Sequence, residues 1–268
     1  MSDAPSTVPP ARELRGRVAL VTGVGRKRGI GSAVCRALAS RGADVVFSFW
    51  TPYDRETPWA SDEGEPEALL GELRASGVGA DGVEVDLSLP DSARLLLDAA
   101  EERLGRPSIL VNTAAYSARD GFGTLDAEGL DAHYAVNVRA MALLSVLFAR
   151  RYPGGPGGRI VLFSSGQSLG PMPGELAYVA TKGAIEAFTR TLAVEVGHKG
   201  ITVNAVNPGP TDTGWISEDL REEILPKFPL GRVGRPEDAA RLVTFLASDE
   251  AAWITGQVIH SEGGFYRS

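Results

Sequence analysis

Short, continuously apolar runs alternate with longer segments of helical periodicity along nearly the whole chain. Runs that stay apolar at every position are typical of strands buried on both faces, as in a parallel sheet covered by helices. The alternation therefore predicts one α/β domain, a doubly wound parallel sheet with helices on both faces. We expect strands at 17–21, 45–49, 82–85, 109–111, 159–163, 202–206 and 258–260, and helices at 32–40, 67–75, 91–104, 130–151, 176–196 and 236–247.

The 268 residues contain no linker or shift in composition that would divide the chain, so we place a single domain at 16–268. The start of the chain is rich in Ser and Pro and lacks the apolar segment of a signal peptide. We predict a flexible tail at 1–15. A long loop is expected at 51–66, where three prolines occur among several acidic residues.

Composition and charge argue against several classes of protein. A formal net charge of −7 does not provide the basic surface that nucleic-acid binding needs. No uninterrupted apolar stretch approaches the ~20 residues of a membrane helix. The single cysteine, Cys35, cannot form an internal disulfide, which favours a reducing compartment and a cytoplasmic protein. The three histidines lack metal-ligand spacing, so we expect no metal.

A glycine-rich segment at 22–31 lies between the first predicted strand and the first predicted helix. Glycine lets the backbone approach a phosphate closely, and the helix that follows offers free N–H groups and the positive end of its dipole. In an alternating chain, this is the place where the pyrophosphate of a dinucleotide binds. We expect Gly23, Gly29, Ile30 and Gly31 to hold it.

The second part of the dinucleotide pattern is absent. An acidic residue usually ends the second strand and binds the ribose hydroxyls, but residues 47–51 contain no Asp or Glu. Nothing there would repel the 2′-phosphate of NADP, and Arg26, Lys27 and Arg28 offer positive charge for it. This pattern favours NADP. NAD is the alternative, because three basic residues also suit a solvated loop.

Further motifs follow the glycine loop in a characteristic order. They are Asp86-Leu87, Asn112-Thr113-Ala114-Ala115, Asn137, Ser164-Ser165, Tyr178-Val179-Ala180-Thr181-Lys182, Asn207-Pro208-Gly209-Pro210-Thr211-Asp212-Thr213, Ile254-Thr255-Gly256-Gln257 and Glu262-Gly263-Gly264. Over nearly the whole chain, the set resembles the short-chain dehydrogenase/reductase family, and most closely its 3-oxoacyl-carrier-protein reductase-like members. The resemblance implies a Rossmann-type fold, hydride transfer between a nicotinamide cofactor and a carbonyl carbon, and a homotetramer, with a dimer as the alternative.

Two positions depart from the usual family pattern. Five residues separate Gly23 from Gly29 where the family usually has three, and this longer loop is similar to that of the enoyl-carrier-protein reductase branch. The usual Asn-Asn-Ala-Gly motif also reads Asn-Thr-Ala-Ala at 112–115. Enoyl reductases typically place their tyrosine and lysine further apart, so the spacing of Tyr178 and Lys182 favours carbonyl reduction.

Tyr178 and Lys182 are four residues apart on a predicted helix, so their side chains share one face. A phenol with an ordinary pKa near 10 is a poor base at neutral pH. We expect the neighbouring ammonium, together with an oxidised nicotinamide, to lower the pKa of Tyr178 and suit it to proton transfer.

Two further catalytic residues follow from the resemblance. Ser165 lies thirteen residues before Tyr178, after a predicted strand, where its hydroxyl could donate to the substrate oxygen. Asn137 lies in an otherwise apolar helix, and the resemblance implies that it holds a water connecting Lys182 to solvent. The alternative is that Asn137 is a helix-bending polar residue whose buried amide is satisfied by a neighbouring strand.

The resemblance also assigns cofactor contacts along the chain. Tyr178 and Lys182 would contact the nicotinamide end as well as catalyse. The remaining expected contacts are Arg28, Trp50, Asp86, Leu87, Asn112, Ala114, Pro208, Gly209, Thr211 and Thr213. The stretch 213–232, with Trp215, Ile216, Leu225 and Phe228, resembles the family's mobile substrate lid, and 170–174 would form the opposite wall.

The sequence therefore predicts an NADPH-dependent oxidoreductase that reduces a ketone or oxidises a secondary alcohol. The first alternative is an enoyl-thioester reductase, suggested by the long glycine loop. The second is a regulatory protein that senses a dinucleotide without catalysis. The substrate is a small molecule whose identity does not follow from the fold.

Overall fold

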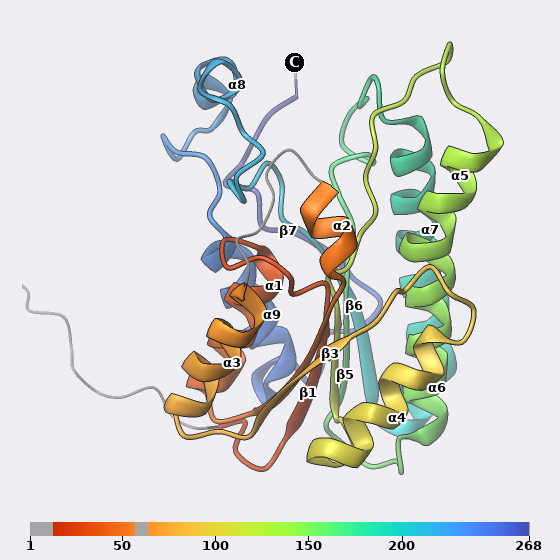
Figure 1. The fold of residues 1–268 in the computed structure, drawn as a ribbon, viewed down its shortest axis with the longest axis vertical. Helices are drawn as coiled ribbons and strands as arrows, with labels where there is room; N and C mark the ends of the chain where they lie inside the picture. Colours follow the sequence, from red (N-terminus) through yellow and green to blue (C-terminus); the bar gives the residue numbers. More distant parts are fainter. Residues whose placement is uncertain (1–12, 57–63, 268) are drawn as a thin grey trace, which may run out of the picture.

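The computed structural model describes residues 13–56 and 64–267, which form a seven-stranded parallel sheet between two layers of helices (Figure 1). The strands lie in the order β3-β2-β1-β4-β5-β6-β7. All seven predicted strands are present, within two residues of the expected ends. Their bounds are β1 Val18–Thr22, β2 Asp44–Phe49, β3 Ala80–Glu84, β4 Ile109–Asn112, β5 Gly158–Phe163, β6 Ile201–Asn207 and β7 Val258–His260.

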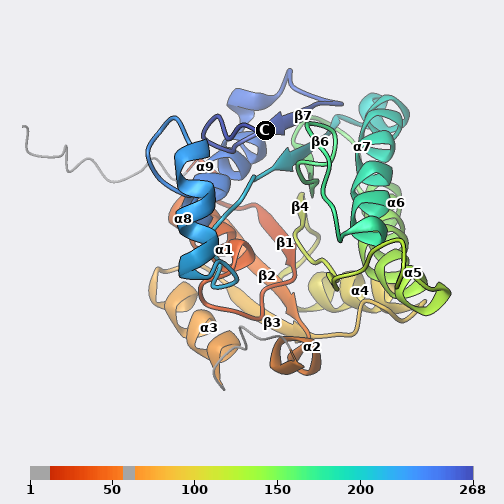
Figure 2. The same ribbon diagram turned by 90° about the horizontal axis from the view of Figure 1, so that it is seen from above.

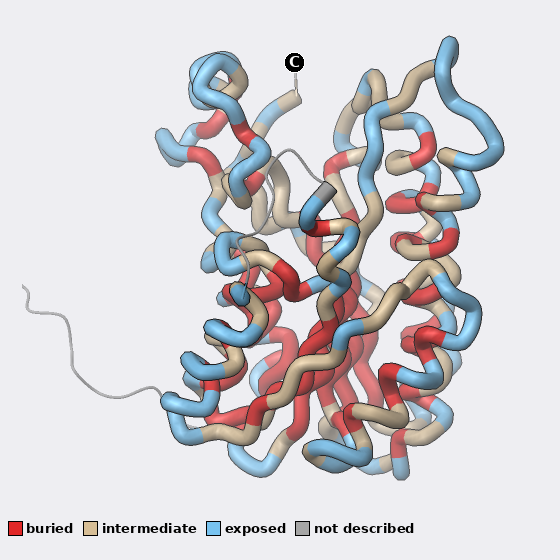
Figure 3. The backbone as a smooth tube through the Cα atoms, in the orientation of Figure 1, coloured by how far each residue is buried: buried red, intermediate tan, exposed pale blue. Residues whose placement is uncertain are grey.

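Each face of the sheet has its own hydrophobic core. On one face, α1 (Ile30–Ser40), α3 (Glu65–Ala75) and α9 (Pro236–Ala247) cover a cluster that includes Val34 and Val243. On the other, α4 (Ser92–Leu104), α6 (Met141–Arg151) and α7 (Leu176–Val196) cover a cluster that includes Leu144 and Phe148. The central strands are buried throughout (Figure 3), which explains why their sequences show no polar alternation. The fold prediction is confirmed.

The strand order reverses between β1 and β4, which are direct neighbours in the sheet. In doubly wound sheets a crevice for ligands opens outside the carboxyl ends of the strands at such a point. Figure 2 views the domain from this edge, with α2, α5 and α8 arranged around it. We therefore expect a ligand site at the carboxyl ends of β1 and β4, where the strand order reverses.

Three predicted segments differ in the structure. The segment 51–66, predicted as a loop, contains the short helix α2 (Thr51–Glu56) and the start of α3, while 57–63 lies outside the described residues. The helix predicted at 130–151 begins earlier, as α5 (Ala127–Tyr134), and continues through a π-helical segment at Ala135–Ala140 into α6. The predicted tail lies mostly outside the described residues, but Leu14 is buried in the core.

The continuous helix from Ala127 to Arg151 is long and apolar enough to cross a membrane by length and composition, with a mean hydropathy of 1.4 over its most apolar 18 residues. Polar residues such as Asn137 and Arg139 interrupt the apolar residues of this helix, so the prediction that no uninterrupted apolar stretch approaches ~20 residues still holds. Half of the apolar window is buried inside the domain, as in the core helix of a soluble protein. Among the described residues, no three His, Cys, Asp or Glu side chains form a group that could hold a metal ion.

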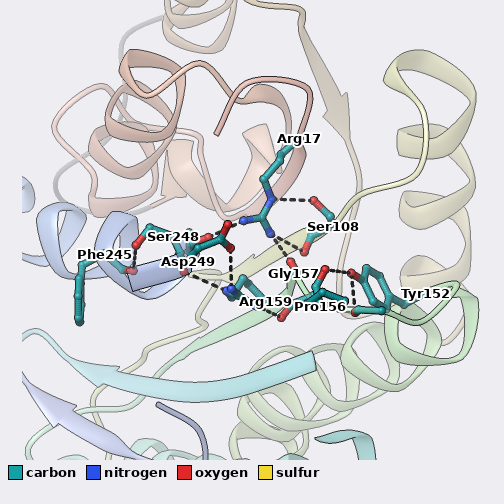
Figure 4. A network of polar contacts seen from close by, with 12 residues as sticks. Arg17, Ser108, Tyr152, Pro156, Gly157, Arg159, Phe245, Ser248 and Asp249 are labelled. Carbon is teal, nitrogen blue, oxygen red and sulfur yellow. Dashed lines mark hydrogen bonds and ion pairs between the residues drawn. The ribbon is translucent and has the colours of Figure 1, made fainter. Parts of the chain in front are cut away.

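A polar network closes the amino-terminal edge of the sheet, opposite the crevice (Figure 4). Arg159, in β5, donates to the carbonyls of Gly158 and Ser248 and to the Asp249 carboxylate. Arg17, just before β1, donates to Ser108 and to the carbonyls of Gly157 and Ala247. The two arginines thus connect the loops at the start of β4 and β5 to the end of α9.

Candidate active site

Three of the four predicted catalytic residues meet at the carboxyl end of β5. Ser165 lies two residues beyond this strand, and its hydroxyl hydrogen-bonds to the hydroxyl of Tyr178 on α7. Lys182, one turn further along α7, places its Nζ 5.3 Å from the centre of the Tyr178 ring. The same Nζ donates to the carbonyl of Phe163, the last residue of β5, at 2.8 Å. Strand and helix together hold these side chains in one cluster.

Burial controls the protonation of this cluster. Desolvation raises the pKa of Tyr178 to about 12, against the opposing effect of its hydrogen bond from Ser165. Burial also lowers the pKa of Lys182 to about 8. The expectation of a lowered Tyr178 pKa is thus wrong for the protein by itself, because desolvation penalises the phenolate more than its neighbours stabilise it. The phenol is protonated at neutral pH and can act as a proton donor.

Asn137 is buried, at 1% exposure, in the π-helical segment between α5 and α6. Its Oδ1 accepts from the backbone N–H of Tyr116 at 2.7 Å, and its Nδ2 donates to the Tyr116 carbonyl at 2.9 Å and to Thr181 Oγ1 at 3.0 Å. The side chain therefore ties the loop after β4 to the residue that precedes Lys182. Its predicted role in a proton relay stays a prediction.

The glycine loop has the close packing and the free helix end that a pyrophosphate site requires. Gly23 has a φ of +73°, and a Cβ there would lie 2.5 Å from the Cα of Ala114. A Cβ on Gly31 would lie 2.7 Å from the carbonyl oxygen of Gly23. Gly29 caps α1 without a side-chain hydrogen bond, so a phosphate has room at the first N–H groups of this helix. These residues fit a dinucleotide.

The basic residues of the glycine loop, Arg26, Lys27 and Arg28, lie next to acidic side chains that are distant in the sequence. Arg26 Nε lies 3.7 Å from Asp54 Oδ1, and Arg26 Nη1 donates to the carbonyl of Thr213 at 3.2 Å. Arg28 Nη2 lies 3.4 Å from Asp212 Oδ1. Lys27 Nζ lies 3.5 Å from Glu72 Oε1. All three cations predicted to attract a 2′-phosphate thus lie next to carboxylates.

Asp54 is the residue that sequence reasoning missed here. It lies on α2, where only a loop was expected, and a Cβ on Gly25 would lie 1.7 Å from its Oδ2. Burial raises its pKa, and Arg26 opposes that effect. Pro52 in the first turn is a helix-start signal that could have revealed α2. The second strand lacks a terminal carboxylate, but the fold supplies one from α2.

The remaining predicted cofactor residues lie around the same edge. Thr22 Oγ1 accepts from the N–H of Ala114 at 3.2 Å, which joins the ends of β1 and β4. Asn112 donates instead to Ser145 on α6, at 3.2 Å, so its amide is engaged away from the glycine loop. The Asp86 carboxylate accepts a hydrogen bond from the backbone N–H of Ser88. Leu87 packs against the hydrophobic cluster on the α4 side of the sheet. Trp50 is 37% exposed.

The loop after β6 leads into the predicted lid. Gly209 adopts a φ of +61°, and Thr211 Oγ1 donates to the carbonyl of Pro208 at 3.1 Å. Beyond Thr213, Ile216 and Phe228 pack with Ile224, on α8 (Glu218–Ile224), into a small cluster of their own. The lid residues Trp215 and Leu225 are 37% and 39% exposed. The segment predicted to be a lid thus has a small hydrophobic cluster of its own, against which Phe265 packs.

Known proteins resemble this chain along nearly its full length. A family model described as enoyl-(acyl carrier protein) reductase matches residues 23–266. The chain is 51% identical to the uncharacterized oxidoreductase YjdA of Bacillus subtilis, over 94% of this chain and 97% of the relative. It is 37% identical to the 3-oxoacyl-acyl-carrier-protein reductase FabG of Pseudomonas aeruginosa, over 95% of this chain and 99% of the relative.

Among solved structures, a short-chain dehydrogenase from Burkholderia cenocepacia in complex with NADP superposes with a TM-score of 0.84 at 32% identity, covering 94% of this chain and 98% of that chain. This likeness in fold accompanies the matched sequence motifs and the cluster of Ser165, Tyr178 and Lys182. The protein therefore belongs to the short-chain dehydrogenase/reductase family of oxidoreductases, which act on CH–OH and C=O groups.

Proposed function

We propose that this protein is an NADPH-dependent ketoreductase, similar to 3-oxoacyl reductases, that can also run in reverse on a secondary alcohol. The observation that carries the proposal is the cluster of Ser165, Tyr178 and Lys182, in which burial keeps the tyrosine protonated. A phenol with a pKa raised to about 12 holds its proton until a substrate oxygen becomes strongly basic, as a ketone oxygen does on reduction.

A bound nicotinamide supplies the hydride. Ser165 donates a hydrogen bond to the substrate oxygen and stabilises the charge that develops there. Tyr178 transfers its proton to the same oxygen. Lys182, whose pKa is lowered to about 8, can exchange a proton near neutral pH and restore the phenol. Asn137 holds the loop beside this path through the backbone of Tyr116.

The proposed cofactor is NADPH, with NADH as the alternative. Two similar solved proteins were crystallised with NADPH or NADP. Arg26 and Arg28 lie at the glycine loop, where a 2′-phosphate could bind to them. Asp54 opposes this preference, because its carboxylate already engages Arg26 and would repel a phosphate.

The direct test follows consumption of NADPH and of NADH with a panel of carbonyl compounds that includes 3-oxoacyl thioesters. We expect faster oxidation of NADPH with at least one ketone, and formation of the corresponding secondary alcohol. Absence of turnover with every carbonyl compound, although the cofactor binds, would favour the non-catalytic, dinucleotide-sensing alternative.

An enoyl-thioester reductase is the second candidate. The five residues between Gly23 and Gly29 are similar to the loop of that branch, and the matching family model carries its description. A 2-enoyl thioester supplied in place of a 3-oxoacyl thioester separates the two reactions. Reduction of the enoyl compound alone would replace the ketoreductase proposal.

We further propose a cytoplasmic homotetramer assembled through α6 and α7, with a dimer as the alternative. Apolar side chains on these helices are solvent-exposed in the monomer, including Leu143 at 43% and Val194 at 84%. Light scattering coupled to size-exclusion chromatography measures the mass. A monomer at micromolar concentration would exclude both assemblies.

A further inference from the structure

A buried carboxylate on α7 lies beneath the loop that carries Ser165. Glu186 is 7% exposed and follows Tyr178 and Lys182 at intervals of four residues. Residues spaced in this way lie on one face of a helix. The two proposed catalytic residues and this carboxylate are therefore fixed to the same rigid element.

Three side chains of the loop donate to a single oxygen of Glu186. Its Oε1 accepts from Ser164 Oγ at 2.8 Å, from Gln167 Nε2 at 2.7 Å and from Ser168 Oγ at 3.0 Å. The donors flank Ser165 on both sides in the sequence. The loop is thus tied to α7 immediately before and shortly after the residue that hydrogen-bonds to Tyr178.

The charge of Glu186 is little compensated by cations. Arg190 Nη2 lies 3.8 Å from Glu186 Oε2, and the Arg190 side chain is 61% exposed. A partly buried carboxylate with one weak ion pair is costly to the fold unless hydrogen bonds satisfy it. An ionised carboxylate only accepts hydrogen bonds, and hydrogen bonds to it are stronger than those to a neutral oxygen. The three donors of the loop therefore match a carboxylate at this position.

We propose that Glu186 is a positioning residue, which ties the 164–168 loop to α7 so that Ser165 reaches Tyr178 and the substrate oxygen. This inference depends on the proposed roles of Ser165 and Tyr178. Because Glu186 and Tyr178 share one helix, the loop that carries Ser165 is held by the same element that carries the tyrosine. An error of about 1 Å in such a geometry can cost on the order of 100-fold in rate.

The test compares E186A and E186Q with E195A, in which an exposed glutamate of the same helix is removed. We expect E186A to lower kcat by roughly 10- to 100-fold, with the Kd of the cofactor unchanged. E186Q keeps an acceptor oxygen and should retain more activity than E186A. E195A should match the wild type. An E186A enzyme with unchanged kcat would overturn the inference.

A double-mutant cycle distinguishes positioning of Ser165 from a general structural role. If Glu186 acts through Ser165, E186A should cost little more in a background that already carries S165A. An equal fold-loss of kcat in both backgrounds would show that Glu186 acts by another route.

Amide hydrogen exchange separates failure of this inference from failure of the proposed function. Exchange at 164–168 should speed up in E186A relative to E195A, whether or not any substrate is turned over. An inactive wild type would disprove the ketoreductase proposal. Unchanged exchange in E186A would disprove the positioning role.

Discussion

A buried cationic side chain lies at each end of β5, and the two side chains differ in how fully they are hydrogen-bonded. Arg159, near the amino end, is 2% exposed, and Lys182, at the carboxyl end, is 3% exposed. Burial lowers the pKa of both groups. Each also donates to a backbone carbonyl of β5, Arg159 to Gly158 and Lys182 to Phe163.

The difference lies in how completely each cation is bonded. Arg159 uses Nε, Nη1 and Nη2 for Ser248, Gly158 and Asp249, and a guanidinium does not lose its proton in proteins. The Lys182 ammonium has three N–H donors, and within the described residues one hydrogen bond is formed, to Phe163. A lysine with a pKa of about 8 can also exchange its proton. Bonds from all three nitrogens indicate a structural cation, whereas a single bond and a labile proton indicate a functional one.

The largest effect that this comparison predicts is on the chemistry at the carboxyl end. We expect Y178F to lower kcat by about 10²- to 10⁴-fold, because the proton donor is lost. Cofactor affinity and thermal stability should stay close to those of the wild type. Steady-state kinetics and a cofactor titration measure both quantities. Undiminished turnover would exclude Tyr178 as the proton donor.

At the amino end of β5, we expect removal of the Arg159 side chain to lower the free energy of unfolding and to leave kcat unchanged. R159A removes the donor that reaches the carbonyl of Ser248, at a cost of about 1–3 kcal/mol in the free energy of unfolding. Urea unfolding measures the loss, and kcat below the unfolding transition should match the wild type. A fall in kcat without a loss of stability would contradict the division between the two ends.

The pH dependence of stability tests the labile proton of Lys182. Its pKa falls from 10.5 to about 8 on folding, so the unfolded chain binds this proton more tightly between those values. Stability contributed by Lys182 should therefore rise with pH from about 8 to 10.5, by roughly 1–3 kcal/mol.

The raised pKa of Tyr178 acts in the opposite direction, since deprotonation of the unfolded phenol lowers stability only above pH 10. Burial also raises the pKa of Cys35 above its ordinary value of 9.0, which lowers stability over the same range. The contribution of Lys182 is therefore the difference between the wild type and a Lys182→Met variant in the change of unfolding free energy from pH 8 to pH 10. We expect K182M to lose the rise that the wild type shows. The same slope in both proteins would mean that Lys182 is not desolvated.

The smallest expected effect concerns Arg26, a cation at the carboxyl edge that is held by Asp54. Removing the charge of Asp54 should free Arg26 for a 2′-phosphate. We expect D54N to raise the ratio of kcat/KM for NADPH over NADH by roughly 10-fold, an effect of about 1.4 kcal/mol. D212N, which affects Arg28 in the same way, is the matched comparison. A lower ratio in D54N would indicate that Asp54 does not compete with the phosphate.

Local patterns in the sequence were sufficient for the architecture. The runs around Leu20 and Val161 are buried on both faces of the sheet, so their hydrophobicity alone identified them as strands. Tyr178 and Lys182 were found together because helical spacing is a property of one element. Ser165 followed from its distance to Tyr178 in a known motif.

Only the tertiary structure decided which residues distant in the sequence come into contact and how far they are buried from solvent. Asp54 and Arg26 are separated in sequence by α1 and β2, and Glu186 belongs to no motif around Ser165. For the protein by itself, the direction of the Tyr178 pKa shift was also mispredicted, because it depends on desolvation by many surrounding atoms. Sequence spacing determined the elements and their order, whereas contacts and burial across the assembled sheet determined charge pairing and proton affinity.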